Sequence, residues 1–263
     1  MSKSVNYVER FANAIAEGRP VVGTEITLTD PLASEVAAEA GSDFLWIETE
    51  HAHLDLPAVL NHLLAARAAQ VPAFVRVGWN DEVLIKRIID LAPAGIVVPM
   101  VNTAEQAAAA VRAFRYPPHG VRGWGPVRNM MYFDSTDDYV AAAGDQVLCI
   151  VQIEHVEAVR NLDAILATPG IHGIVLGRGD LSASMGKHSR NTDPEVVEAV
   201  DTVIAKASAT NLFVGTSIGF DADTVRDWFE KGVQWFALGD TIGHISEGTA
   251  AVVQGVRDLK LSR

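Results

Sequence analysis

Short runs of apolar residues alternate with amphipathic or alanine-rich segments along the whole chain. Most of the short runs are almost continuously hydrophobic, as is typical of parallel strands that are covered on both faces. Eight such runs predict strands: Val21–Glu25, Phe44–Glu48, Ala73–Val77, Gly95–Pro99, Val147–Glu154, Gly173–Gly177, Phe213–Ser217 and Trp235–Leu238. The segments between them predict helices: Pro31–Ala40, Leu56–Ala69, Asp81–Leu91, Ala104–Phe114, Pro194–Ala209 and Ala222–Lys231. Asn80 and Thr103 are placed to cap the third and fourth of these helices.

Eight strand–helix units in 263 residues predict an α/β protein with one (β/α)8 TIM barrel that spans residues 1–263. A barrel of this kind needs about 250 residues, and no linker or shift in composition divides the chain. A doubly wound open sheet is the alternative. One connection is longer than the others: residues 116–144 are rich in glycine and proline and contain Arg122. Such a loop is often a lid or an intersubunit arm, and surface decoration is the other interpretation.

Composition narrows the class of protein. A formal net charge of −12 argues against a nucleic-acid partner, because phosphate backbones bind basic surfaces. No run approaches the ~20 apolar residues of a membrane span, and there is no secretion signal core, so we expect a cytoplasmic protein that does not enter a membrane. The one cysteine, Cys149, excludes an intrachain disulfide and lies in an apolar run, where a buried inert thiol is expected.

Chemically active side chains gather at the predicted strand ends. In a β/α barrel the active site lies where the strands end, so these side chains should converge on one rim. They are Glu48, Glu50 and His51 after the second strand, Arg76 after the third, Gln152 and Glu154 after the fifth, and Arg178, Gly179 and Asp180 after the sixth.

Glu154 and Asp180 come from adjacent strands, so they could share a hard divalent cation such as Mg²⁺, Mn²⁺ or Co²⁺. The alternative is a pair of ordinary acids, with Asp180 capping the helix that follows it. His51 is suited to proton transfer at neutral pH. Arg76 keeps its charge and offers a fixed fork of donors to a carboxylate or an enolate oxygen, although a structural ion pair would use the same side chain.

Two rival chemistries have weaker support. Schiff-base aldolases need a lysine on a strand, and no predicted strand contains one. Gly215–Gly219 matches the Gly-x-Ser-x-Gly elbow of serine hydrolases, but the only histidine after it is His244, so we interpret the glycines as a tight strand exit. Outside enzymology, a non-catalytic barrel that binds small acids is the remaining alternative.

Several motifs, taken together and in order, resemble the 4-hydroxy-2-oxoheptanedioate aldolase family. This is a class II, metal-dependent branch of the phosphoenolpyruvate/pyruvate barrel superfamily. The resemblance implies cleavage or formation of 4-hydroxy-2-oxo acids, to or from an aldehyde and pyruvate or a related 2-oxo acid, through an enolate. An oxaloacetate-type decarboxylase that uses the same site is the alternative. The matching motifs are Trp46–His51, Val75-Arg76 with Trp79–Asp81, Val98–Val101, Arg115–Pro118 with Arg122-Gly123, Val151–Glu154 and Gly177-x-x-Asp180-Leu181-Ser182.

The resemblance also implies a metal site and an assembly. Glu154 and Asp180 match the metal ligands, and Gln152 would lie beside the cation. Backbone amides around Gly179 and Asp180 would receive the carboxylate of the 2-oxo acid. The family commonly forms a homohexamer, a trimer of dimers, in which C-terminal helices are exchanged between subunits.

The remaining roles concern the reacting atoms. Arg76 matches the arginine that contacts the ketone oxygen and stabilises the enolate. His51 matches the acid/base histidine, and Asp90 resembles the aspartate that orients it. The family usually has Asp-Gly-Glu-His where this chain has Glu48-Thr49-Glu50-His51, so the longer Glu48 is expected to alter the contacts behind the site.

A second departure concerns the loop that contains the second metal ligand. The family usually has Gly-Pro-x-Asp with a small third residue, whereas this chain has Gly177-Arg178-Gly179-Asp180. The change loosens the loop and adds a cation. We predict that Arg178, or Arg122 from the long loop, binds a distal anionic group of the substrate; the alternative for Arg178 is an outward orientation toward solvent.

Overall fold

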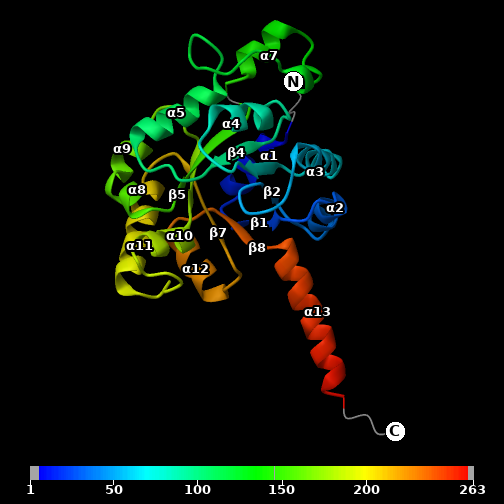
Figure 1. Ribbon diagram of the computed structural model, residues 1–263, viewed down its shortest axis with the longest axis vertical. Helices are drawn as coiled ribbons and strands as arrows, with labels where there is room; N and C mark the ends of the chain where they lie inside the picture. Colours follow the sequence, from blue (N-terminus) through cyan, green and yellow to red (C-terminus); the bar gives the residue numbers. More distant parts are fainter. Residues whose placement is uncertain (1–5, 145, 260–263) are drawn as a thin grey trace.

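The computed structural model describes residues 6–144 and 146–259, and its strands close into one parallel barrel in the order β1 to β8 (Figure 1). This confirms the TIM-type barrel and excludes the doubly wound sheet. Every predicted strand is present, with ends within two residues of the prediction. The strands are β1 Val21–Ile26, β2 Phe44–Glu48, β3 Ala73–Arg76, β4 Gly95–Val98, β5 Leu148–Ile153, β6 Gly173–Leu176, β7 Phe213–Ile218 and β8 Trp235–Asp240.

Helices cover the outside of the barrel, and all six predicted ones are present. They are α2 Leu32–Glu39, α3 Leu56–Ala68, α4 Glu82–Ile89, α5 Ala104–Phe114, α11 Pro194–Ser208 and α12 Ala222–Glu230. The structure adds α1 Val8–Ala16, α6 Val127–Met130, α7 Thr136–Ala142, α8 Val156–Arg160, α9 Leu162–Leu166, α10 Arg178–Ser184 and α13 Thr241–Arg257.

One of the two predicted helix caps is correct. Thr103 caps α5 in a full capping box with Gln106. The prediction for Asn80 is wrong, because the carboxylate of Asp81 accepts hydrogen bonds from the first free amides of α4, those of Val83 and Leu84. The Asn80 amide instead donates to the Gln106 carbonyl at 3.0 Å.

Aromatic side chains fill the end of the barrel where the strands begin. Phe11 of α1 closes this end and meets Phe74 edge-on, with ring centroids 4.9 Å apart. Trp235 of β8 is fully buried beside them and lies 5.6 Å from the Phe74 ring. Glycine is required on the neighbouring strand, because a Cβ on Gly215 would lie 2.0 Å from the Trp235 indole. The interior of the barrel is therefore filled with side chains at its strand-start end, and the strand ends are the place where chemistry is expected.

Aliphatic residues form the outer core between the strands and the helices, among them Ile47, Val75 and Leu176. Cys149 lies in this layer, and burial raises the pKa of its thiol to about 12. The predicted inert, buried cysteine is thus confirmed.

Residues 116–144 lie at the rim where the strands begin. This follows from the topology, since α5 runs back to that rim and the segment then leads into the start of β5. Figure 1 shows α7 at the end of the molecule opposite to α13. The segment is therefore not a lid over the strand ends of its own barrel.

The last helix, α13, departs from the barrel at the opposite end and extends away from it (Figure 1). Almost all of its residues are exposed, including Ile245, Val252 and Val256. These three lie on one face of the helix, because they are spaced by seven and four residues. Across residues 6–144 and 146–259, no helix is long and apolar enough to cross a membrane.

Candidate active site

Polar side chains form the last layer of the barrel interior, at the ends of the strands. Alternate residues of a strand face the same side, so Trp46 and Glu48 of β2 both point inward, as do Phe74 and Arg76 of β3. Glu48, Arg76, Gln152 and Glu154 are buried, with exposed fractions of 1%, 7%, 2% and 2%. Buried charges at this density are costly unless they are paired or serve a ligand, which marks this rim as the candidate site.

Arg76 is held by two carboxylates. Its Nε lies 2.6 Å from Glu48 Oε2 and 3.2 Å from Glu50 Oε2. Glu48 in turn accepts a hydrogen bond from Trp46 Nε1 at 3.0 Å, and its other oxygen accepts from the backbone amides of Glu50 and His51 at 2.6 and 2.9 Å. The longer Glu48 therefore fixes both the guanidinium and the backbone that leaves β2.

His51 lies at the edge of this group. Its side chain is 66% exposed, and its Nε2 is 3.7 Å from Glu50 Oε2. Thr49, one of the departures from the family motif, donates from Oγ1 to the Arg76 carbonyl at 2.5 Å and so ties the ends of β2 and β3 together. The histidine is thus accessible from solvent and lies next to the charged cluster.

Glu154 is oriented from three sides. The backbone amide of Met100 donates to Oε1 at 2.7 Å, and Gln152 Nε2 donates to Oε2 at 2.5 Å. Met100 adopts a left-handed backbone conformation, with φ of 55°, which is costly for a residue with a side chain. On the third side, Gly177 lies so close that a Cβ there would be 2.7 Å from Glu154 Cβ.

Sequence reasoning did not find Met100 or this role of Gly177. Neither carries reactive chemistry, and the conformation at Met100 leaves no mark in the residue type. The Gly177 signal was available, because a glycine at the end of a buried strand often permits a close backbone approach.

The electrostatics of the rim favour a cation. Burial raises the pKa of Glu154 to about 7, and the negative charges of Glu50 and Asp180 add to the shift. Burial also raises the pKa of Glu50 to about 7, against the opposing effect of Arg76. Like charges gathered in a poorly solvated place are relieved by a bound positive charge.

The donor set fits a hard divalent cation with open positions. Gln152 Oε1 is buried without a hydrogen-bond partner, next to the Glu154 carboxylate. Within the described residues, no three His, Cys, Asp or Glu side chains form a ready-made metal cluster. Two carboxylates, from Glu154 and Asp180, would leave the remaining positions to water and substrate oxygens.

Asp180 lies in the first turn of α10 and is exposed. The N-cap position belongs to Gly177, so the alternative in which Asp180 caps this helix is wrong. The backbone amides of Gly179 and Asp180 are in the same turn, where N–H groups have no acceptor inside the helix.

The two arginines that were predicted to bind a distal anion lie in different surroundings. Arg122 is 3% exposed and pairs with Asp90 at 2.7 Å, at the end of α4 that leads into β4. That place is the strand-start rim, so the hypothesis that Arg122 binds a distal anion in its own barrel mouth is wrong. Asp90 likewise cannot reach His51 within one chain.

Arg178 packs over the Trp228 ring of α12 at 5.2 Å, and therefore does not extend freely into solvent.

Two further polar residues reach the mouth. Ser217 of β7 donates a short hydrogen bond to Glu25 Oε1 of β1. His244 does not pair with this serine, since its Nε2 lies 2.9 Å from Thr24 Oγ1. The serine hydrolase interpretation is therefore wrong. Inward alternation along Val21–Ile26 was the sequence signal that could have placed Glu25 in the site.

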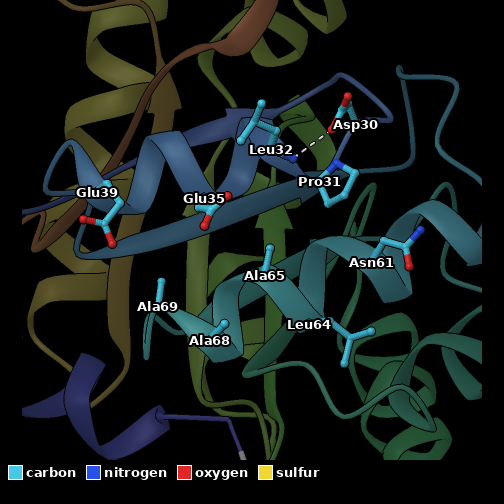
Figure 2. A pocket seen from close by; sticks show the side chains of 10 residues that line it. All are labelled: Asp30, Pro31, Leu32, Glu35, Glu39, Asn61, Leu64, Ala65, Ala68 and Ala69. Carbon is cyan, nitrogen blue, oxygen red and sulfur yellow. Dashed lines mark hydrogen bonds between the residues drawn. The ribbon is translucent and has the colours of Figure 1, made fainter.

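A groove of about 540 Å³ lies on the outer wall between α2 and α3 (Figure 2). It is lined by Leu32, Glu35 and Glu39 of α2 and by Leu64 and several alanines of α3. Since the groove lies on the helical layer and not among the strand ends, it is separate from the candidate site.

Comparisons with known proteins agree with this chemistry. The model of the HpcH/HpaI aldolase/citrate lyase family matches residues 26–247. The chain is 34% identical to a 5-keto-4-deoxy-D-glucarate aldolase of Salmonella arizonae, over 92% of this chain and 94% of that one. It is 36% identical to a hydroxypyruvate/pyruvate aldolase of Pseudomonas aeruginosa, over 88% and 87%. The structure of an HpcH/HpaI aldolase/citrate lyase family protein from Burkholderia cenocepacia superposes with a TM-score of 0.85, at 31% identity and 94% and 98% coverage.

Proposed function

Because the chain belongs to the HpcH/HpaI aldolase/citrate lyase family and is a carbon–carbon lyase of the aldolase type, we propose that it works with a divalent cation on 4-hydroxy-2-oxo acids. In this proposal it forms or cleaves these acids to or from an aldehyde and pyruvate, or a related 2-oxo acid.

One observation carries the proposal. Glu154 is buried, is oriented by Met100 and Gln152, and shares one rim with Asp180 and Arg76. A structural carboxylate at this depth would be expected to have a positive partner, and Glu154 has hydrogen-bond donors and other carboxylates around it instead. Such a carboxylate is oriented for a ligand, and a bound cation would supply the positive charge that it lacks.

Glu154 and Asp180 would hold the cation. When bound, it would act as a Lewis acid toward the ketone and carboxylate oxygens of a 2-oxo acid. Gln152 keeps one Glu154 oxygen in place by donating to it, and Met100 does the same for the other. First-turn amides of α10, at Gly179 and Asp180, are proposed to receive the substrate carboxylate.

Arg76 is proposed to stabilise the enolate. Its Nε lies 2.6 Å from Glu48 Oε2, which fixes the plane of the guanidinium. Its terminal nitrogens are proposed to donate to the enolate oxygen. His51 is proposed to take the proton from the 4-hydroxyl during cleavage and to return it during synthesis. Its exposure lets it exchange that proton with solvent.

The test is a pyruvate-release screen over hydroxy-oxo acids with Mg²⁺, Mn²⁺ and Co²⁺, each beside a chelator control. We expect turnover only with a cation, and a loss of about 10³-fold or more in Glu154→Ala. Glu157→Ala, an exposed residue of α8, is the matched control. Unchanged turnover in Glu154→Ala would overturn the metal mechanism.

The same preparation distinguishes the decarboxylase alternative. Oxaloacetate and a hydroxy-oxo acid are compared by kcat/KM under one set of conditions. A clear preference for oxaloacetate would replace aldol cleavage by decarboxylation as the main activity, while the roles of Glu154 and Arg76 would stay as proposed.

We also propose a homohexamer, a trimer of dimers, in which α13 of one subunit packs on another. A helix of 17 residues that leaves its barrel with an apolar face exposed is expected to find a partner surface. Asp90 could orient His51 only from a neighbouring copy, because the two lie at opposite rims of one chain. Light scattering after gel filtration should give six times the chain mass of 28.2 kDa, and a monomeric mass would contradict the proposal.

A further inference from the structure

The side of the barrel mouth opposite Glu154 has its own polar wall. In a closed barrel of eight strands, β1 lies across from β5, and β7 and β8 complete the same side. Glu25 of β1 and Ser217 of β7 meet there through a hydrogen bond that spans β8. Neither residue takes part in holding the cation or in the contacts of Arg76 with Glu48, so the proposed donor site leaves them without a role.

This wall is rich in carboxyl groups. Burial raises the pKa of Glu25, and the carboxylates of Glu48 and Asp240 act in the same direction. Asp240 begins α13 and accepts from the amides of Ile242 and Gly243, which places a further carboxylate at the end of β8. The positive charge near Glu25 is that of Arg76, which already pairs with Glu48 at 2.6 Å.

The two substrates of an aldol addition would then approach from different sides. The 2-oxo acid is held on the β5 and β6 side, by the groups around Glu154 and Asp180. The aldehyde must reach the enolate carbon from the open side of the mouth, so its substituent points toward β1 and β7. Glu25 and Ser217 are the groups that it meets.

We propose that Glu25 and Ser217 form the acceptor wall and select aldehydes that carry a hydroxyl next to the carbonyl. This inference rests on the proposed aldolase function. Ser217 already donates to Oε1 of the half-buried Glu25, so a substrate hydroxyl donates to the second carboxylate oxygen and adds a hydrogen bond. An alkyl aldehyde covers that oxygen without offering a donor, and a carboxylate-bearing aldehyde is repelled by Glu25 and Asp240.

The experiment measures kcat/KM for aldol addition of pyruvate to three acceptors: glyceraldehyde with a hydroxyl, propanal without one, and succinic semialdehyde with a carboxylate. The ratio between two acceptors cancels effects on the donor half of the reaction. Ser217→Ala and Glu25→Gln should each lower the glyceraldehyde-to-propanal ratio by about 10-fold or more. Glu25→Gln should also raise the relative rate with succinic semialdehyde, because it removes the charge and keeps the shape.

Glu230→Gln, an exposed change on α12, is the control and should leave all ratios unchanged. Thermal unfolding identifies a variant that fails to fold, and the two wall variants report independently. Ratios that stay within about 2-fold of wild type in both folded variants overturn the inference, since a real hydroxyl contact is worth more than that.

A separate measurement tests the proposed function on its own. Cation-dependent exchange of the pyruvate methyl protons with deuterium oxide needs no aldehyde and reports enolate formation. If the wild type exchanges the methyl protons but the acceptor ratios of the two wall variants do not change, the proposed acceptor wall is refuted and the proposed aldolase function stands. An absence of exchange and of aldol addition refutes the proposed function, and the wall with it.

Discussion

Replacing Gly177 with Ala tests whether Glu154 must lie against the end of β6. The added Cβ would be 2.7 Å from Glu154 Cβ, 2.9 Å from Glu154 Oε2 and 3.0 Å from Gln152 Nε2. Ordinary contact begins near 3.4 Å, so Glu154 has to move by about 0.7 Å at its Cβ and about 0.5 Å at its carboxylate oxygen. Backbone strain is not the cause, because Gly177 has a φ of −98°, which alanine adopts freely.

A shift of this size should weaken the binding of a divalent cation by about 10-fold to 100-fold, as loss of a residue that orients a ligand does. It should also lower kcat/KM by about 30-fold to 100-fold, or about 2–3 kcal/mol in activation free energy. Titration calorimetry with Mn²⁺ measures the first effect, and pyruvate release from a hydroxy-oxo acid measures the second.

Gly125→Ala is the matched control, because an added Cβ at Gly125 meets nothing within 4 Å and the residue lies at the opposite rim. Thermal unfolding in a chelator shows whether either variant disturbs the barrel itself. Cation affinity and turnover that are equal in Gly177→Ala, Gly125→Ala and wild type would refute the reasoning, since Glu154 would then not depend on its place against β6.

Three other changes have definite expectations. Arg76→Met should lower kcat by about 10²-fold to 10³-fold, because the enolate loses its stabilising charge. It should also lower the free energy of unfolding in urea by about 3–5 kcal/mol, because the Glu48 carboxylate is left buried without its positive partner. Equal stability of Arg76→Met and Arg76→Lys would contradict this. Gly215→Ala should cost about 1–3 kcal/mol, because its Cβ would lie 2.0 Å from Trp235, and an unchanged thermal midpoint would count against the packing. Burial lowers the pKa of His62 below its ordinary 6.5, so its stabilising effect is present above that pH and is lost as the pH falls. In His62→Gln, the urea midpoint should therefore fall less than in wild type between about pH 7.5 and pH 5.5.

Much of the barrel could be predicted from the chain because parallel strands buried on both faces need continuous apolar runs. The eight runs gave the strands, and the rule that barrel sites lie at strand ends gave Glu48, Arg76 and Glu154. The prediction of a helix cap was wrong where two neighbouring residues could both cap the same helix. Asn80 and Asp81 are both residue types that cap helices, and the structure shows that Asp81 is the one that accepts from two free amides of α4.

What the sequence alone determined is the architecture, the chemical types available at the rim and the family of carbon–carbon lyases. Only the tertiary structure decided which groups meet. Strand alternation aimed Glu25 inward, and barrel closure brought it to Ser217, 192 positions away in the chain. Closure also placed Asp90 and Arg122 together at the far rim. Such partners are set by strand order and register in three dimensions, and one strand's pattern carries no information about which strand will lie across the barrel from it.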